Sequence, residues 1–336
     1  MSNEKKSRDS FFDNYKAFLI LCVVIGHFSD HFTNDFRLAE ILRIYIYFFH
    51  IPAFSFISGY FARKNNFGAL IEKLLVPYLV FQVIYYIMYT GVGRDVDFAL
   101  FSPYFTLWYL LALFCWRVVI GLFNNDKLLL PLSLIGSLLI GFLPDIGDTF
   151  SIYRVVSFFP FFVLGHSFHR ERFDNMCELK ISKLISVLFV GGLFFFVYTH
   201  ADLFDIPVLN CQASYEDLGL GSSGWIQRLF FFAVSTALIF FIGTLIPKKK
   251  NPFTFLGKYT MRVYLCHGIV YKFLYYGTDT LDIVDSIGDF ILYLIASILL
   301  AFLLSQIPLE SILNQITGFF KFLFRPLTSA KNNLIG

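Results

Sequence analysis

Charged residues are scarce in this sequence. Asp, Glu, Lys and Arg make up only 15% of its 336 residues, while 57% are hydrophobic and the mean hydropathy is +0.66. A typical soluble domain is about 25% charged, so this chain has too few polar side chains to cover a soluble globule. The composition excludes that class and predicts an integral membrane protein.

Cysteine is also sparse, and its spacing does not suggest a fold held together by disulfide bonds or by a metal ion. The five cysteines form no C-x-x-C pair, and three of them lie inside apolar blocks. We therefore expect neither a disulfide framework nor a metal site. The net charge of +3 is too small to indicate a nucleic-acid partner.

Apolar blocks occupy most of the chain, and ten of them approach the roughly 20 residues that a helix needs to cross a bilayer. The number of spans could differ from ten by two, because two blocks are short and Pro160 allows a broken or re-entrant helix in the sixth block. We expect an all-α, polytopic membrane bundle forming a single domain over 1–336, with a short N-terminal segment 1–13 and a tail from about 308 to 336. The predicted spans are 14–32, 41–61, 73–91, 105–123, 127–144, 153–169, 181–200, 225–246, 257–277 and 287–307.

Lys and Arg are divided unevenly among the loops. With the N-terminus in the cytoplasm, the loops on that side hold 19 of these residues. The opposite loops hold four, namely Arg37, Arg43, Arg94 and Arg154. Because basic loops stay on the cytoplasmic side, the pattern predicts a multi-pass protein of the cell membrane with both termini in the cytoplasm.

Three histidines are predicted at similar depth inside three spans. In KAFLILCVVIGH, ten residues separate Lys16 from His27, which corresponds to about 16 Å along a helix. His50 and His267 reach a similar level in the second and ninth spans. Ionisable groups at this depth are costly and usually face the bundle interior or a water-filled cavity. Taken alone, His50 or His267 could equally bond between helices, an interpretation that is weaker for His27. Lys16 could be an interfacial anchor.

Two further residues begin predicted spans on the outer side. They are Trp108, in LWYLLALFCWR, and Arg154, in IYRVVSFFPFFVLGH. An interfacial aromatic and a solvated arginine are the ordinary interpretations, and substrate binding is the alternative. Arg262 lies deeper, in the ninth span, and needs a partner or an aqueous path.

Four blocks in order resemble the acyltransferase-3 family of membrane acyltransferases, especially its fucose 4-O-acetylase-like branch. They are FFDNYKAFLILCVVIGHF, FFHIPAFSFISGYFARK, LWYLLALFCWR with RVVSFFPFFVLGHSF, and FLGKYTMRVYLCHG. The resemblance implies a helical bundle that moves an acyl group, usually acetyl, from cytoplasmic acyl-CoA to a hydroxyl of a cell-envelope or exopolysaccharide sugar. The family's first-helix pattern, a cation followed after ten residues by histidine, falls on Lys16 and His27.

Imidazole chemistry agrees with this resemblance. Near neutral pH an imidazole can take the proton of a sugar hydroxyl or carry the acyl group itself. We expect His27, Lys16 and His50 to form the catalytic set, and the sequence leaves open whether His27 is base or nucleophile. We expect Trp108, Arg154 and His267 to bind the acceptor glycan.

Acetyl-CoA is the expected donor, and its phosphates need cations on the cytoplasmic side. The candidates are Lys16, Arg63, Lys64 and Lys73. They do not form the tight double-arginine motif of the family, so the sequence does not assign the phosphate contacts to particular cations. Membrane lipid and polysaccharide biosynthesis proteins are the other expected partners.

Two other classes of function fit the same residues. A polysaccharide transporter or flippase could use the buried histidines as a proton relay, although the sequence shows no repeated halves with paired broken helices. An interaction or sensor protein with incidental polar residues is the third class. Turnover of acetyl-CoA would separate the enzyme from both.

Overall fold

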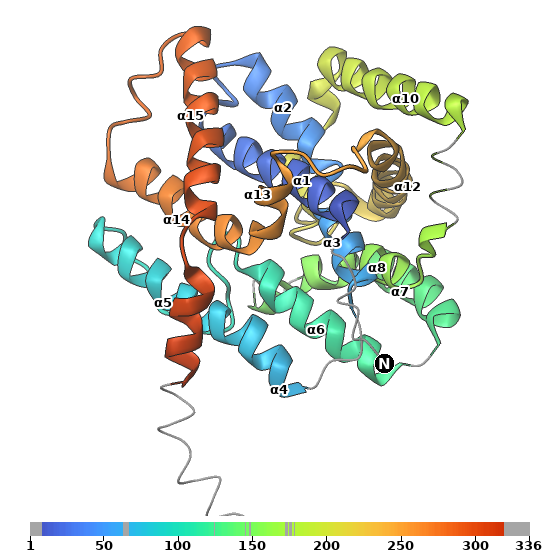
Figure 1. Ribbon diagram of the computed structural model, residues 1–336, viewed down its shortest axis with the longest axis horizontal. Helices are drawn as coiled ribbons and strands as arrows, with labels where there is room; N and C mark the ends of the chain where they lie inside the picture. The colour runs from blue at the N-terminus through green and yellow to red at the C-terminus, as the bar shows by residue number, and fades with distance from the viewer. Residues whose placement is uncertain are drawn as a thin grey trace, which may run out of the picture.

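A computed structural model describes residues 9–62, 67–123, 125–144, 146, 147, 149–171, 174, 177 and 179–318. Within these ranges the regular structure is helical throughout (Figure 1). The helices are α1 (Ser10–Phe28), α2 (Arg37–Tyr47), α3 (His50–Tyr60), α4 (Phe67–Leu70), α5 (Val76–Gly91), α6 (Trp108–Leu122), α7 (Asp126–Ile140), α8 (Ile152–His166), α10 (Lys180–Thr199), α11 (Ile206–Leu209), α12 (Gly224–Leu245), α13 (Thr254–Lys258), α14 (Thr260–Gly277) and α15 (Ile287–Ser305). A π-helical turn, Ile71–Leu75, joins α4 to α5.

Each of the ten predicted spans contains a helix. Seven helical segments in the described ranges are long and apolar enough to cross a membrane, and Trp108–Leu122 is a shorter apolar helix. The predicted all-α, polytopic membrane fold is confirmed, with seven segments rather than ten meeting both criteria. Most of the predicted N-terminal segment, residues 1–8, and the end of the predicted tail, residues 319–336, lie outside the described part of the chain.

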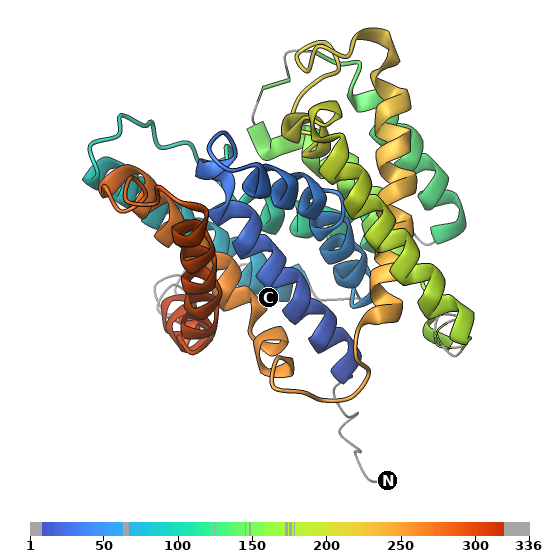
Figure 2. The ribbon, with the colours of Figure 1, turned by 90° about the horizontal axis from the view of Figure 1, so that it is seen from above.

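Helix α1 runs through the middle of the bundle (Figures 1 and 2). It packs against α2, α3, α13, α14 and α15. Asn14 fixes its first turns, because Nδ2 donates hydrogen bonds to the carbonyls of Pro247, at 2.7 Å, and Lys249, at 2.9 Å. The start of α1 is therefore bound to the loop that follows α12.

Ion pairs join the other basic loops to this end of α1. Arg170 pairs with Asp9 at 3.2 Å, and Lys248 pairs with Asp174 at 2.8 Å. The start of α1 and the segments around Arg170 and Lys248 thus share one face of the molecule. We call it the N-terminal face.

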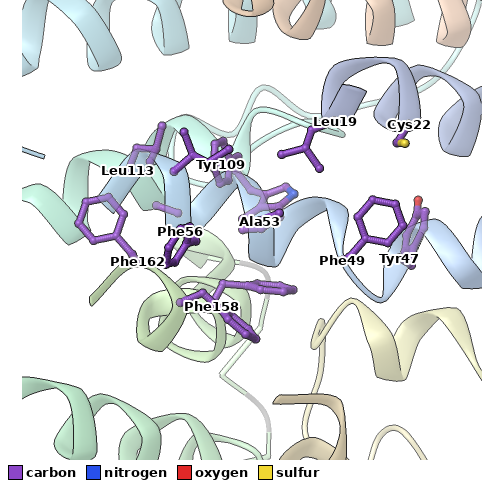
Figure 3. Packing of buried hydrophobic residues seen from close by; sticks show 14 of the residues in the cluster. Leu19, Cys22, Tyr47, Phe49, Ala53, Phe56, Tyr109, Leu113, Phe158 and Phe162 are labelled. Carbon is purple, nitrogen blue, oxygen red and sulfur yellow. The ribbon is translucent and has the colours of Figure 1, made fainter. Parts of the chain in front are cut away.

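Helices α3 and α8 cross backbone to backbone. A Cβ atom at Gly59 would overlap the carbonyl group of Phe162, and one at Gly165 would overlap the carbonyl group of Phe56. Figure 3 shows Phe56 and Phe162 at this crossing. Small residues allow helices in membranes to approach this closely, so the two glycines fix the position of α3 and of His50 at its start.

The sequence allows an interrupted helix in the sixth predicted span. The structure has an interruption in the second predicted span instead. Helix α8 is continuous across Pro160, whereas the span predicted over 41–61 is interrupted between α2 and α3. Ser235 of α12 donates to the carbonyl of Phe48 at 2.5 Å, so the interruption keeps this backbone group bonded. Such breaks occur in membranes where the backbone is buried in protein or lines a cavity. Here the break makes His50 the first residue of α3.

One face of α15 is covered by large exposed aliphatic side chains. Leu292, Ile295, Leu299 and Leu303 are all exposed. Their spacing of three, four and four residues places them on one side of the helix. A stripe of this kind is typical of a helix that faces lipid.

Candidate active site

A cavity of about 620 Å³ opens between α1, α3, α6 and α14, within the roughly 300–1,000 Å³ usual for ligand sites. Lys16, Ile20, Val23 and His27 form its α1 wall. Their spacing of four, three and four residues puts them on one helical face, so this wall follows α1 for about 16 Å. Beyond His27 the cavity continues to Arg154.

His27 lies in the last turn of α1, because the helix ends at Phe28, four residues earlier than predicted. Its ring centroid is 4.8 Å from that of Phe105 and 5.4 Å from that of His267. Its Nδ1 lies 3.5 Å from the hydroxyl oxygen of Tyr47. The structure therefore places this imidazole on the cavity wall among rings from three other segments.

His50 and His267 share one hydrogen-bonding arrangement. Nδ1 of His50 bonds the carbonyl of Ile46 at 2.8 Å, and Nδ1 of His267 bonds the carbonyl of Val263 at 2.9 Å. Because a carbonyl only accepts, each Nδ1 carries the hydrogen and each Nε2 keeps a lone pair. His50 lines the cavity. His267 is fully buried beside His27 and is not part of the cavity wall, and its Nε2 has no hydrogen-bond partner among the described residues.

A charged pair in the cavity wall was missed in the sequence. Arg43 and Asp30 approach to 2.5 Å, and both line the cavity. The Arg43 guanidinium also lies 5.6 Å from the ring centroid of Tyr47, whose ring is 4.8 Å from that of His50. One signal was available, since Asp30 follows His27 by about one helical turn. Arg43 counted only as an outer charge, although it lies in the same predicted span, 41–61, as His50.

Arg154 and Trp108 are neighbours at the end of the cavity away from Lys16. The Arg154 guanidinium lies 5.3 Å from the Trp108 ring centroid and donates to Gln212 Oε1 at 3.2 Å. All three residues line the cavity. Helix α8 runs from Arg154 toward Arg170 at the N-terminal face, so this end lies on the opposite side of the bundle.

Of the four cations predicted to bind the donor phosphates, the structure describes Lys16 and Lys73, and only Lys16 lines the cavity. Lys16 lines the cavity and pairs with the buried carboxylate of Asp13 at 2.9 Å. Lys73 is exposed on the π-helical turn and does not line the cavity. Arg63 and Lys64 lie outside the described residues.

The cavity residues offer acid–base chemistry by imidazole. His27 and His50 face a space with room for a bound hydroxyl, and a neutral imidazole can accept a proton from such a group. Among the described residues, no group of three or more His, Cys, Asp or Glu side chains is arranged to hold a metal ion.

Fold and cavity together define a multi-pass membrane protein with an internal imidazole site. The chain belongs to the acyltransferase-3 family, because a family model described as an acyltransferase domain matches residues 9–306. The protein is therefore an acyltransferase, and the family predicted from the four sequence blocks is confirmed.

A curated relative supports the same assignment. The chain is 32% identical over 216 residues to Nodulation protein NolL of Sinorhizobium fredii, and this match covers 56% of the chain and 57% of the relative. The chain thus spans a little over half the length of that protein. No solved structure matches the chain. Membership of an acyltransferase family favours the enzyme over the transporter and the sensor.

Proposed function

We propose that this acyltransferase moves an acetyl group from acetyl-CoA to a hydroxyl of a cell-envelope or exopolysaccharide sugar. The observation that carries the proposal is the continuous cavity from Lys16 past His27 to Arg154. Because a cation, an imidazole and a polar far end share one space, donor and acceptor can meet at His27. The likeness of the sequence blocks to the fucose 4-O-acetylase-like branch supports a sugar as acceptor.

The Lys16 end of the cavity receives the donor. CoA carries several negative charges, and the Lys16 ammonium would neutralise part of that charge at the entrance. Beyond it the apolar Ile20 and Val23 line the path, which suits the uncharged arm of CoA. The roughly 16 Å from Lys16 to His27 along α1 brings the thioester to the imidazole. Additional phosphate contacts by Arg63, Lys64 and Lys73 stay predictions.

His27 acts as general base in the proposed reaction. It takes the proton of the sugar hydroxyl while that oxygen attacks the thioester carbonyl carbon. The new C–O bond forms, the C–S bond breaks, and the proton passes from His27 to the departing CoA thiolate. In this proposal both substrates enter one cavity, so the transfer needs no acyl-enzyme. The Tyr47 hydroxyl and the Nε2 lone pair of His50 orient the reacting groups.

Trp108 and Arg154 bind the acceptor sugar in this proposal. An indole face can cover the apolar C–H face of a sugar ring, and the guanidinium can donate hydrogen bonds to hydroxyl oxygens. Gln212 bonds Arg154 at 3.2 Å and adds a neutral polar group beside it. The acceptor therefore enters from the side opposite Lys16.

We place the N-terminal face in the cytoplasm, where the donor is found. The uneven division of Lys and Arg supports this orientation, and the ion pairs Arg170–Asp9 and Lys248–Asp174 gather the basic segments on that face. Both termini are then cytoplasmic and the protein resides in the cell membrane. Lipid covers the α15 stripe, and polysaccharide biosynthesis proteins supply the acceptor.

The test compares a strain lacking the protein with the same strain complemented. Mass spectrometry of its surface glycans should show one acetyl group fewer per modified unit after deletion, restored by the wild-type chain. In parallel, purified protein in lipid nanodiscs should release CoA thiol from acetyl-CoA when membrane glycolipid from the deletion strain is added. Unchanged glycan acetylation in the deletion strain would refute the proposed function.

A further inference from the structure

The segment between α5 and α6 is bonded back onto α5, and its second half, residues 102–107, lies within the bundle. Gln82, fully buried in α5, donates from Nε2 to the carbonyls of Ala99, at 2.6 Å, and Ser102, at 2.9 Å. Its Oε1 accepts from the backbone N–H of Tyr104 at 3.1 Å. One side chain thus satisfies three backbone groups of residues 97–107, which we call the inner loop.

The inner loop reaches deep into the bundle. Gln82 lies nine residues before Gly91, the end of α5, which is about 13 Å along the helix. Non-helical backbone at such depth is tolerated only where it is buried in protein or lines a cavity. Residues 102–106 line the cavity, so the loop forms part of the reaction site.

Phe105 carries the contact between the inner loop and the proposed base. Its ring centroid is 4.8 Å from that of His27 and 5.9 Å from that of Tyr271, on which it stacks. The Lys272 ammonium lies 4.6 Å from the same ring. Tyr271 stands one helical turn past His267, away from the N-terminal face, so Phe105 covers His27 from the side opposite Lys16.

The backbone of Phe105 is strained in this position. Its φ of 45° lies in the left-handed region, which is unfavourable for a bulky residue and persists only where the surroundings impose it. Two features of α14 allow it here. Tyr264 donates to the carbonyl of Thr106 at 2.5 Å, and Gly268 leaves room for the ring, since a Cβ there would come within 2.9 Å of Phe105.

We propose that Phe105 determines the specificity of transfer by restricting the approach of water to His27 while the acceptor site is empty. This inference rests on the proposed function. Water is a hydroxyl nucleophile small enough to reach an open site, and closing a site around a reactive donor prevents its hydrolysis. The Phe105 ring narrows the cavity beside His27, which leaves fewer positions from which a water can attack, and a bound sugar fills the remaining space.

Transfer to the sugar and hydrolysis by water break the same C–S bond and use the same base. In transfer, the sugar oxygen attacks the acetyl carbon, the C–S bond breaks, and the proton moves through His27 to the CoA thiolate. In hydrolysis, water supplies the oxygen, and acetate replaces the sugar ester as product. Removing Phe105 should therefore increase hydrolysis through His27, which distinguishes an open site from a damaged one.

The experiment measures release of radiolabelled acetate from acetyl-CoA by purified protein in nanodiscs without any acceptor. Phe105→Ala should release acetate at least about tenfold faster than wild type, a change in barrier of about 1.4 kcal/mol, and should lower glycan acetylation in cells. The matched control is Phe101→Ala, because Phe101 is on the same loop, is 52% exposed and does not line the cavity. It should behave as wild type, and the double variant Phe105→Ala/His27→Ala should lose the added hydrolysis.

A folded Phe105→Ala protein that releases acetate at the wild-type rate would overturn the inference. If that variant fails to fold, Phe105→Leu decides, since its smaller side chain keeps apolar contact but leaves a gap beside His27. An unchanged rate in Phe105→Leu then overturns the inference as well. A wild-type protein that acetylates no glycan in cells contradicts the proposed function itself, and with it this role of Phe105.

Discussion

His27 and His267 lie ring against ring, with centroids 5.4 Å apart and an angle of 30° between their planes. They come from helices near opposite ends of the chain, α1 and α14. Nδ1 of His267 bonds a backbone carbonyl, and its Nε2 has no hydrogen-bond partner among the described residues, so His267 presents a fixed, buried ring to His27. Because His267 does not line the cavity, we expect it to act by positioning His27, and its predicted contact with the acceptor stays untested.

Replacing His27 should abolish glycan acetylation. Loss of a general base slows such reactions by roughly 10²–10⁴-fold, whereas alanine in place of a polar side chain favours membrane insertion. His267→Ala should reduce the rate by a smaller factor, because the base remains. The measurement is the O-acetyl content of surface glycans, normalised to protein abundance in the membrane.

His200 supplies the control for this series. It is exposed and does not line the cavity, so His200→Ala should leave acetylation unchanged. A His27→Ala protein that inserts normally and keeps most of its acetylation would exclude His27 as base. His50, whose Nε2 lone pair lies at the same cavity, would be the next candidate.

Charge removal at Lys16 should weaken donor binding more than it slows turnover. A hydrogen bond to a charged group contributes about 1.5–3 kcal/mol, so KM for acetyl-CoA should rise roughly tenfold or more, with kcat at saturating donor little changed. Single replacement would leave the buried Asp13 without its 2.9 Å ion pair. The informative variant is therefore Lys16→Met combined with Asp13→Asn.

Lys250→Met is the matched comparison, since Lys250 is exposed and does not line the cavity. Steady-state kinetics with varied acetyl-CoA should show no change in its KM. If the Lys16 double variant also keeps the wild-type KM, the phosphates are bound elsewhere on the N-terminal face.

The position of the α1 site residues could be predicted from sequence because it depends on local geometry. Residues four, three and four positions apart share one helical face whatever surrounds the helix, so Lys16 and His27 had to line the same surface. The helical character of the spans likewise follows from length and apolar content. The family motifs then gave the type of chemistry.

The inner loop and the break before His50 could not be predicted, because both depend on partners distant in sequence. Gln82 bonds three backbone groups of the loop, and Ser235 bonds the carbonyl at the break. A lone Gln or Ser in an apolar block does not reveal which backbone group it will meet. Arg43 was overlooked for a different reason, because it counted only as an outer charge although its partner Asp30 lies in the adjacent predicted span.

Adding one methyl group at the crossing of α3 and α8 should destabilise the fold. In Gly165→Ala the new Cβ would overlap the backbone of Phe56, and overpacking of this kind costs about 1–3 kcal/mol or more. Gly191→Ala is the control, because no atom lies within 4 Å of a Cβ built there. It should be neutral or slightly stabilising, since alanine favours a helix more than glycine does.

Thermal unfolding in nanodiscs, followed by circular dichroism, measures the difference. We expect a lower midpoint for Gly165→Ala and an unchanged or higher midpoint for Gly191→Ala. Equal midpoints for the two variants would mean that the close crossing of α3 and α8 does not limit stability.

The orientation of the chain should be readable from cysteines placed at the two ends of α12. Ser222 precedes this helix and Lys249 follows it, and both are exposed, so about 33 Å of helix separates the two probes. The native Cys211 is a poor reporter, because it is 1% exposed and burial raises the pKa of its thiol, whereas the thiolate is the reactive form. In intact cells, a membrane-impermeant maleimide should label Ser222→Cys and not Lys249→Cys, and both should be labelled after the membrane is permeabilised. Labelling of Lys249→Cys alone in intact cells would place the N-terminal face outside, and the donor could then not reach Lys16 from the cytoplasm.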